Sequence, residues 1–237
     1  MAEAPPAPAG ARPRRRTLAG TRQFRILPTR FPPVSLFETL VAPDELEVLY
    51  ALESMTNDRI QAEAGNLHLV PKDEWVTGPG ATIVMAAFTH TGRESRFSAG
   101  SYGVYYAGRD IDTAIAETVF HAERRLRDTD EPAIELDMRC HIGAVAAPLE
   151  DIRGRRYAHL RDPDIGTWPA CQRFGASRRA AGAQGLLYRS ARRAGGECIA
   201  AFRPRAVSRP RPARLLRYCW NGERIDRVIA VSSIRAL

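Results

Sequence analysis

The order in which helical and strand-like segments follow one another constrains the fold more than any other feature of this sequence. A long segment from Asp112 to about Arg127 carries apolar residues at helical spacing. Short apolar segments of strand length follow it at Ala133–Met138, Ile142–Ala147, Gly185–Tyr188, Cys198–Phe202 and Val228–Val231. The series lacks the regular strand–helix–strand alternation of a doubly wound sheet. It therefore predicts an α+β fold with mainly antiparallel strands.

The remaining segments fit the same class. We expect strands at Phe24–Leu27, Ala81–Phe88 and Val104–Ala107, and helices at Asp44–Leu52, Asn57–Gly65 and Cys171–Ala181. The residues from Thr89 to Gly103 are polar and contain glycine, which predicts a flexible loop.

The first 22 residues differ in composition from the rest of the chain. They are rich in proline, alanine, glycine and arginine and have no hydrophobic periodicity, so we expect a disordered tail at 1–22 and one domain at 23–237. Residues 1–30 contain seven arginines and one acidic residue, and therefore carry +6 of the net charge of +8. The rest of the chain is close to neutral, so its charge does not by itself indicate a nucleic-acid-binding domain.

The four cysteines, at 140, 171, 198 and 219, are widely spaced and form no C-x-x-C pair. We expect reduced, buried thiols, a cytoplasmic protein and no metal site. No apolar run is long enough to span a bilayer, so no membrane contact is expected.

Common enzyme signatures are missing from the sequence. Gly78 and Gly80 lack the spacing of a dinucleotide-binding fingerprint, and no Walker A sequence is present. Ser190 is not in a G-x-S-x-G turn, which argues against a hydrolase triad.

Two segments carry a more specific pattern. The first runs from Arg96-Phe97 through the G-V-Y-Y-A sequence at 103–107 to Ala116-Glu117 on the following helix. The second is the L-Y-R-S-A-R-R sequence at 187–193, followed by G-G-E-C at 195–198. Together they resemble the RES-domain family, whose members are toxins of bacterial toxin–antitoxin systems. The resemblance covers roughly residues 24–232.

The resemblance implies a fold, an activity and a partner. The implied fold is like that of ADP-ribosyltransferases, with a split antiparallel β-sheet that holds NAD+ in a central cleft. The implied reaction cleaves the nicotinamide–ribose bond of NAD+, which is a substrate and not a bound prosthetic group. The acceptor stays open between inorganic phosphate, water and a protein side chain. The implied partner is an Xre-type antitoxin, in a complex that could contain several copies of the toxin.

The resemblance also implies four site residues, whose chemistry suits this reaction. Arg96 can bind phosphate through its two-pronged guanidinium. Tyr105, the first of two adjacent tyrosines on one strand, can stack on nicotinamide. Glu117 can hold the ribose hydroxyls and stabilise positive charge on the ribose. Ser190 can position these groups, and no nearby histidine in the sequence suggests that it is a nucleophile.

Other interpretations stay open at this point. Arg192 and Arg193 could bind phosphate or be surface charges. The whole chain could instead be a nucleic-acid-binding protein that uses the basic tail and the six arginines of residues 203–217. A third possibility is a scaffold in which Glu117 and the tyrosines only pack.

Overall fold

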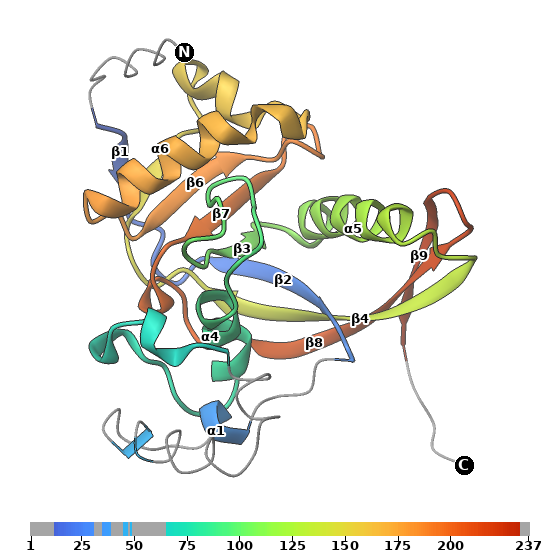
Figure 1. The fold of residues 1–237 in the computed structure, drawn as a ribbon, viewed down its shortest axis with the longest axis horizontal. Coiled ribbons are helices and arrows are strands. Elements are labelled where there is room, and N and C mark those ends of the chain that lie inside the picture. The colour runs from blue at the N-terminus through green and yellow to red at the C-terminus, as the bar shows by residue number, and fades with distance from the viewer. Residues whose placement is uncertain (1–11, 31–34, 39–44, 47, 49–64, 233–237) are drawn as a thin grey trace.

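The structure is a computed structural model that describes residues 12–30, 35–38, 45–46, 48 and 65–232. The helices expected at Asp44–Leu52 and Asn57–Gly65 lie almost wholly outside the described residues. The remaining elements form one sheet with helices on both of its faces (Figure 1). The predicted α+β class is therefore confirmed.

The sheet contains nine strands in the order β1-β5-β6-β7-β3-β2-β4-β8-β9. All neighbours are antiparallel except β5 and β6. The strands are β1 (Arg14–Arg16), β2 (Arg22–Pro28), β3 (Tyr105–Gly108), β4 (Ile134–Ala144), β5 (Leu149–Asp151), β6 (Gly185–Arg189), β7 (Glu197–Ala201), β8 (Arg211–Trp220) and β9 (Ile225–Val231).

The sheet is split between β2 and β3. These strands pair at a single position, Phe24 with Gly108. By contrast, β2 pairs with β4 along its whole length from Arg22 to Pro28, and β3 pairs with β7 along its whole length from Tyr105 to Gly108. Two half-sheets, β1-β5-β6-β7-β3 and β2-β4-β8-β9, therefore diverge from one point, as the expected split sheet requires.

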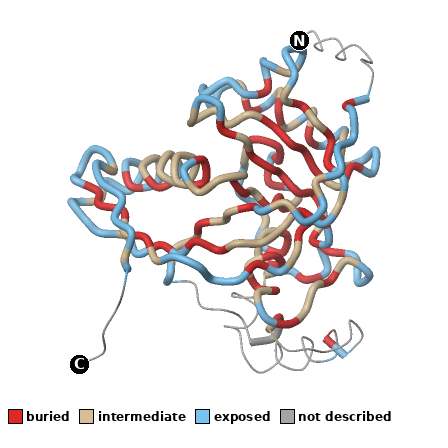
Figure 2. The backbone as a smooth tube through the Cα atoms, turned by 180° about the vertical axis from the view of Figure 1, so that it is seen from behind, coloured by how far each residue is buried: buried red, intermediate tan, exposed pale blue. Residues whose placement is uncertain are grey.

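Four α-helices are described, and each of the three longer ones packs over its own apolar cluster. They are α1 (Ser35–Glu38), α4 (Ala81–Thr89), α5 (Ile111–Asp128) and α6 (Trp168–Ala180). In Figure 1, α5 and α6 lie on one side of the sheet and α4 lies on the other. The α4 cluster includes Tyr105, the α6 cluster includes Tyr188, and the α5 cluster includes Tyr218. Burial is densest in the middle strands and lowest at the two edge strands, β1 and β9 (Figure 2).

The strand predicted at Ala81–Phe88 was wrong, because these residues form helix α4. A short continuous apolar run has no polar face to reveal its period, so its sequence fits a buried helix as well as a buried strand. The beginning of α4 is set by Gly80, whose φ of 85° favours glycine. A Cβ at this position would also lie 2.3 Å from the carbonyl oxygen of Pro210. The carboxylate of Glu38 accepts hydrogen bonds from the N–H groups of Gly80 (2.8 Å) and Thr82 (3.0 Å), and so caps the helix from α1.

The later strands are longer than the sequence indicated. The two strands predicted at 133–138 and 142–147 are one strand, β4, with an irregularity between Arg139 and His141. The arginine-rich stretch at 203–217 contributes strand β8, which lies between β4 and β9. Within it, Arg217 pairs with Glu135 and Asp137 at 3.0 Å each. Arg211, Arg214 and Arg217 therefore belong to the sheet, whereas the other three arginines of the stretch precede β8.

The described chain also begins earlier than expected. Residues 12–22 are described, and β1 pairs with β5 from Arg14–Asp151 to Arg16–Leu149. Strand pairing, together with the Arg16–Asp151 ion pair at 3.1 Å, places these residues on the sheet despite their composition. Residues 1–11 lie outside the described part of the chain.

Helix α5 begins at Ile111, one residue before the segment predicted from Asp112. Its N-cap is Asp110, whose carboxylate accepts the N–H of Thr113 at 2.8 Å, whereas Asp112 lies in the first turn. Gly108 precedes it at the split, and a Cβ there would lie 2.6 Å from the nitrogen of Ala114. The absence of a side chain at Gly108 therefore lets the first turn of α5 pack directly on the point where the half-sheets meet.

All four cysteines are free and buried, as expected. Among the helices that the structure describes, none is long and apolar enough to cross a membrane.

The Glu38 cap generates a stability prediction. We expect Glu38→Ala to lower the free energy of unfolding by about 1–2 kcal/mol, because two N–H groups at the start of α4 lose their acceptor. Urea unfolding followed by circular dichroism measures the change. Glu223→Ala, at an exposed position in the turn between β8 and β9, is the control and should change stability by less than about 0.5 kcal/mol. Equal losses in the two variants would contradict the capping role.

Candidate active site

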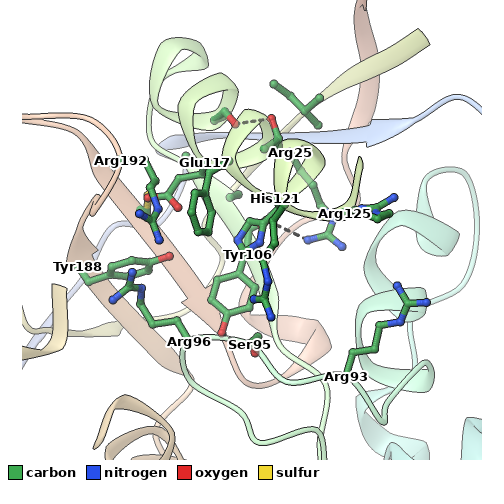
Figure 3. Close-up of a pocket in the computed structure, with 18 of the residues that line it drawn as sticks. Arg25, Arg93, Ser95, Arg96, Tyr106, Glu117, His121, Arg125, Tyr188 and Arg192 are labelled. Atoms are coloured by element: carbon green, nitrogen blue, oxygen red, sulfur yellow. Dashed lines mark hydrogen bonds between the residues drawn. The ribbon is translucent and has the colours of Figure 1, made fainter. Parts of the chain in front are cut away.

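A pocket with a volume of about 590 Å³ opens where the half-sheets diverge. Its walls come from β2, β3, α5 and the loop at 93–96, and from single residues of α6, β6, β7 and the turn between β6 and β7 (Figure 3). The split that separates β2 from β3 thus leaves room for a ligand, and α5 supplies one side of the pocket. The volume is in the range of small-molecule and cofactor sites.

Glu117 and Ser190 are joined in this site although they are 73 residues apart in the chain. The hydroxyl of Ser190 donates to Oε1 of Glu117 at 2.7 Å. The same oxygen lies 3.8 Å from Sγ of Cys198, which also lines the pocket. No described residue makes a hydrogen bond to Oε2 of Glu117. One carboxylate oxygen is therefore anchored, and the other is available to a ligand.

Backbone groups of the turn that follows β6 hold Ser190 in place. Its hydroxyl oxygen accepts the N–H groups of Arg192 and Arg193 at 3.0 Å each, and its own N–H donates to the carbonyl oxygen of Gly196 at 2.9 Å. The hydroxyl of Ser190 thus links two backbone N–H groups of this turn to Oε1 of Glu117. Its geometry fits a positioning group.

The thiol of Cys198 is also unsuited to nucleophilic attack. Burial, followed by the nearby negative charge of Glu117, raises the pKa of Cys198 far above its ordinary value. The group is therefore a neutral thiol that faces the anchored oxygen of Glu117.

Arg96 lines the pocket, but its loop is packed and not flexible as expected. The Arg96 residue is only 7% exposed, and its guanidinium donates to the carbonyl oxygens of Leu160 (3.1 Å) and Asp162 (3.0 Å). The hydroxyl of Tyr106 accepts the N–H of Phe97 and contacts Oγ of Ser95, both at 3.0 Å. These contacts hold the arginine at the pocket wall.

The structure corrects the choice between the two adjacent tyrosines. Tyr105 is fully buried in the α4 cluster, where its hydroxyl contacts Gln23, whereas Tyr106 lines the pocket. Side chains alternate between the faces of a strand, so only one of the two can face the ligand. The sequence predicts that one of the two tyrosines points away from the cavity, but it does not indicate which one. Of the four predicted residues, Arg96 and Glu117 line the pocket, Ser190 anchors Glu117, and Tyr105 lies on the other face.

Arg192 and Arg193 have different roles in the structure. Arg192 lines the pocket with its guanidinium carbon 3.3 Å from the centre of the Phe120 ring, and its Nε and Nη2 are buried without a partner among the described residues. Burial lowers the pKa of Arg192, and the negative charge of Glu117 opposes this shift. Arg193 instead contacts Asp110 and Asp112 at 3.4 and 3.5 Å. Arg192 is therefore the one that could bind an anion in the pocket.

The sequence did not indicate the other residues that line the pocket. Arg25 on β2 donates to the carbonyl oxygen of Tyr106 at 2.9 Å, and Tyr188 on β6 packs edge-on against Phe97. His121 lies one turn after Glu117 on α5. Trp168 at the start of α6 lies 6.2 Å from the His121 ring. Their sequence separations leave no local pattern, because only the folded sheet brings them together.

The charge of the pocket favours an anionic ligand. The pocket is lined by more basic than acidic residues. The six arginines are Arg25, Arg93, Arg96, Arg124, Arg125 and Arg192, and the three acidic residues are Glu94, Glu117 and Asp128. Loss of water around the His121 ring lowers its pKa below 6.5. The nearby Glu117 opposes this shift, and Arg192, Arg124 and Arg96 add to it. Among the described residues, no group of three or more His, Cys, Asp or Glu side chains could hold a metal ion.

Known proteins with similar sequences and structures were compared with this chain. The uncharacterized protein y4oC of Sinorhizobium fredii (strain NBRC 101917 / NGR234) is 32% identical over 214 residues, which cover 87% of this chain and 86% of that protein. The crystal structure of the M. tuberculosis MbcT–MbcA toxin–antitoxin complex contains a chain with 14% identity and a TM-score of 0.37. That likeness covers 54% of this chain and 72% of the other.

The sequence model of one family, the RES domain, matches residues 67–221. This range contains Arg96, Glu117 and Ser190, as well as Tyr106 and Arg192 of the pocket. The match spans well over half of the sequence, and the chain belongs to the RES domain family.

Proposed function

We propose that this RES domain protein is a toxin that cleaves the nicotinamide–ribose bond of NAD+. The observation that carries the proposal is the Glu117 carboxylate, which is anchored through one oxygen by Ser190 and has its other oxygen free in an arginine-lined pocket. This arrangement suits a reaction that builds positive charge on a sugar next to a phosphate-bearing group.

The pocket can bind the parts of NAD+ separately. Arg96 and Arg192 are held close to Glu117, where they can pair with the pyrophosphate. The rings of Tyr106 and Tyr188 offer apolar surface for the nicotinamide. Burial raises the pKa of both tyrosines far above the ordinary value, so their hydroxyls stay neutral.

Glu117 would act on the transition state. The bond between the anomeric carbon of the ribose and the ring nitrogen of nicotinamide breaks, and its electron pair leaves with the nitrogen. Nicotinamide departs as a neutral molecule, so no general acid is needed. The ribose is left with oxocarbenium character, which a fixed carboxylate stabilises without reorganising during the reaction.

The acceptor would come from outside the set of residues near Glu117. The hydroxyl of Ser190 and the thiol of Cys198 both face the anchored carboxylate oxygen and hold their protons. Inorganic phosphate and water can each form a bond from an oxygen to the anomeric carbon, and a target protein from the nucleophilic atom of a side chain, with loss of a proton in each case. The corresponding activities are NAD+ phosphorylase, NAD+ glycohydrolase and ADP-ribosyltransferase.

The proposed role in the cell follows from this chemistry. An enzyme that consumes NAD+ stops growth, so its host needs a means to block it. The family resemblance implies an Xre-type antitoxin protein for this purpose, and we propose such a partner in the bacterial cytoplasm.

Replacing the proposed catalytic carboxylate should separate catalysis from stability. We expect Glu117→Gln to lower kcat for nicotinamide release by about 100-fold or more, with a change in unfolding free energy below about 1 kcal/mol. Release is measured by chromatography and stability by urea unfolding. Glu123→Gln on the same helix is the control, because its carboxylate bonds Ile225 and Arg127 outside the pocket. That variant should lose stability and keep its turnover, and normal turnover in Glu117→Gln would overturn the assignment.

Two neighbouring arginines offer a matched pair for substrate binding. Arg192→Ala should raise KM for NAD+ by about tenfold, the loss expected for one hydrogen bond to a charged group. Arg193→Ala should leave KM within about twofold, because Arg193 pairs with Asp110 and Asp112 outside the pocket. Steady-state kinetics measures both values. Equal effects of the two substitutions would remove Arg192 from the binding site.

The reaction products identify the acceptor. The purified chain is incubated with NAD+, with and without inorganic phosphate, and the products are separated and identified by mass spectrometry. We expect free nicotinamide in at least one of these incubations. ADP-ribose indicates water as the acceptor, and its phosphate ester indicates phosphate. If both mixtures are inert, a lysate from the host that gains ADP-ribosylated protein would indicate a side-chain acceptor. Unchanged NAD+ in all three mixtures would contradict the proposed function.

A further inference from the structure

The end of the pocket away from Glu117 carries its own pair of arginines. Arg93, in the loop after α4, and Arg125, on α5, both line the pocket. Figure 3 shows them on the side opposite to Glu117 and Arg192. Arg125 follows Glu117 by eight residues on α5, which is about 12 Å along the helix axis. The two ends of the pocket can therefore contact different parts of one extended ligand.

The acidic residues at this end do not neutralise the pair. Glu94 and Asp128 both contact Arg124, at 3.8 and 4.0 Å. Among the described residues, no carboxylate lies within 4.0 Å of the guanidinium of Arg93 or Arg125. Partial desolvation lowers the pKa of Arg125, and the positive charges of Arg30 and Arg93 lower it further. Like charges held together in this way favour the binding of an anion.

We propose that Arg93 and Arg125 bind a phosphate monoester at the far end of the dinucleotide, so that the preferred substrate is NADP+. The proposal rests on the proposed function, because it takes the scissile ribose to lie at Glu117. The pyrophosphate then lies near Arg96 and Arg192, and the adenosine ribose lies toward Arg93 and Arg125. The phosphate on that ribose is a dianion, and two guanidinium groups can pair with it. NAD+ has a hydroxyl in its place and leaves both arginines unpaired.

Binding can be tested without turnover by comparing two fragments of the substrates. Isothermal titration of the full chain with adenosine 2′,5′-bisphosphate and with AMP measures the contribution of the added phosphate. We expect the bisphosphate to bind about tenfold more tightly, the effect of a charged hydrogen bond, and the difference to shrink as salt is added. Titration with inorganic phosphate alone shows whether the pair binds a free ion. Equal affinities for the two nucleotides, or no binding of either, would overturn the proposal.

Substitutions locate the effect. In the double variant Arg93→Ala/Arg125→Ala, the affinity for the bisphosphate should fall to within about twofold of that for AMP. Arg127→Ala on α5 is the control, because Arg127 pairs with Glu123 at 2.9 Å and does not line the pocket. It should keep the tenfold preference. The three arginines are exposed, so thermal melting should show that both variants stay folded. A double variant that keeps the preference would place the phosphate elsewhere.

Turnover separates this proposal from the one on which it rests. We expect kcat/KM for NADP+ to exceed that for NAD+ by about tenfold, and the double variant to lose this ratio but still cleave NAD+. If NAD+ is cleaved as well as NADP+, the subsite is wrong and the proposed function stands. If neither is cleaved and the bisphosphate still binds more tightly than AMP through these arginines, the proposed function is wrong and the phosphate site stands.

Discussion

The pairing of β2 with β3 at one position, Phe24 with Gly108, governs the architecture around the site. A longer ladder would close the sheet and fill the space in which the pocket lies. Loss of this single contact would leave the two half-sheets unconnected by backbone pairing. Helix α5 packs against the junction because Gly108 has no side chain, and it presents Glu117 to the opening. The short pairing between β2 and β3 thus explains both the split in the sheet and the presence of a ligand pocket beside it.

Sequence periodicity predicted the secondary structure of those segments that have one apolar and one polar face. Helix α5 shows an apolar stripe and a polar face, and its existence was evident from residues 112–127. Helix α4 is apolar around most of its circumference, so its period was hidden and it was taken for a strand. Strand β8 was missed because its first half is exposed and rich in arginine, as a surface segment would be. In both cases tertiary packing determined the secondary structure, which local composition did not indicate.

The candidate site was predictable to the extent that its residues lie in recognisable segments. The resemblance to the RES-domain family indicated Arg96, Glu117 and Ser190, and the structure brings them to one region. The choice of Tyr105 failed because strand alternation predicts two faces without identifying the one that faces the pocket. The sequence did not predict a role for Arg125, for a different reason. A lone arginine near a helix end is ordinary, and it acquires meaning only when the fold sets it beside Arg93.

The hydrogen bond between Ser190 and Glu117 also has a consequence for the order in which the protein is made. Glu117 leaves the ribosome 73 residues before its anchor does. A nascent chain that ends after α5 carries the carboxylate but has neither the serine nor the turn that orients it. A complete site therefore exists only once the segment that carries Ser190 has been made and has folded against α5.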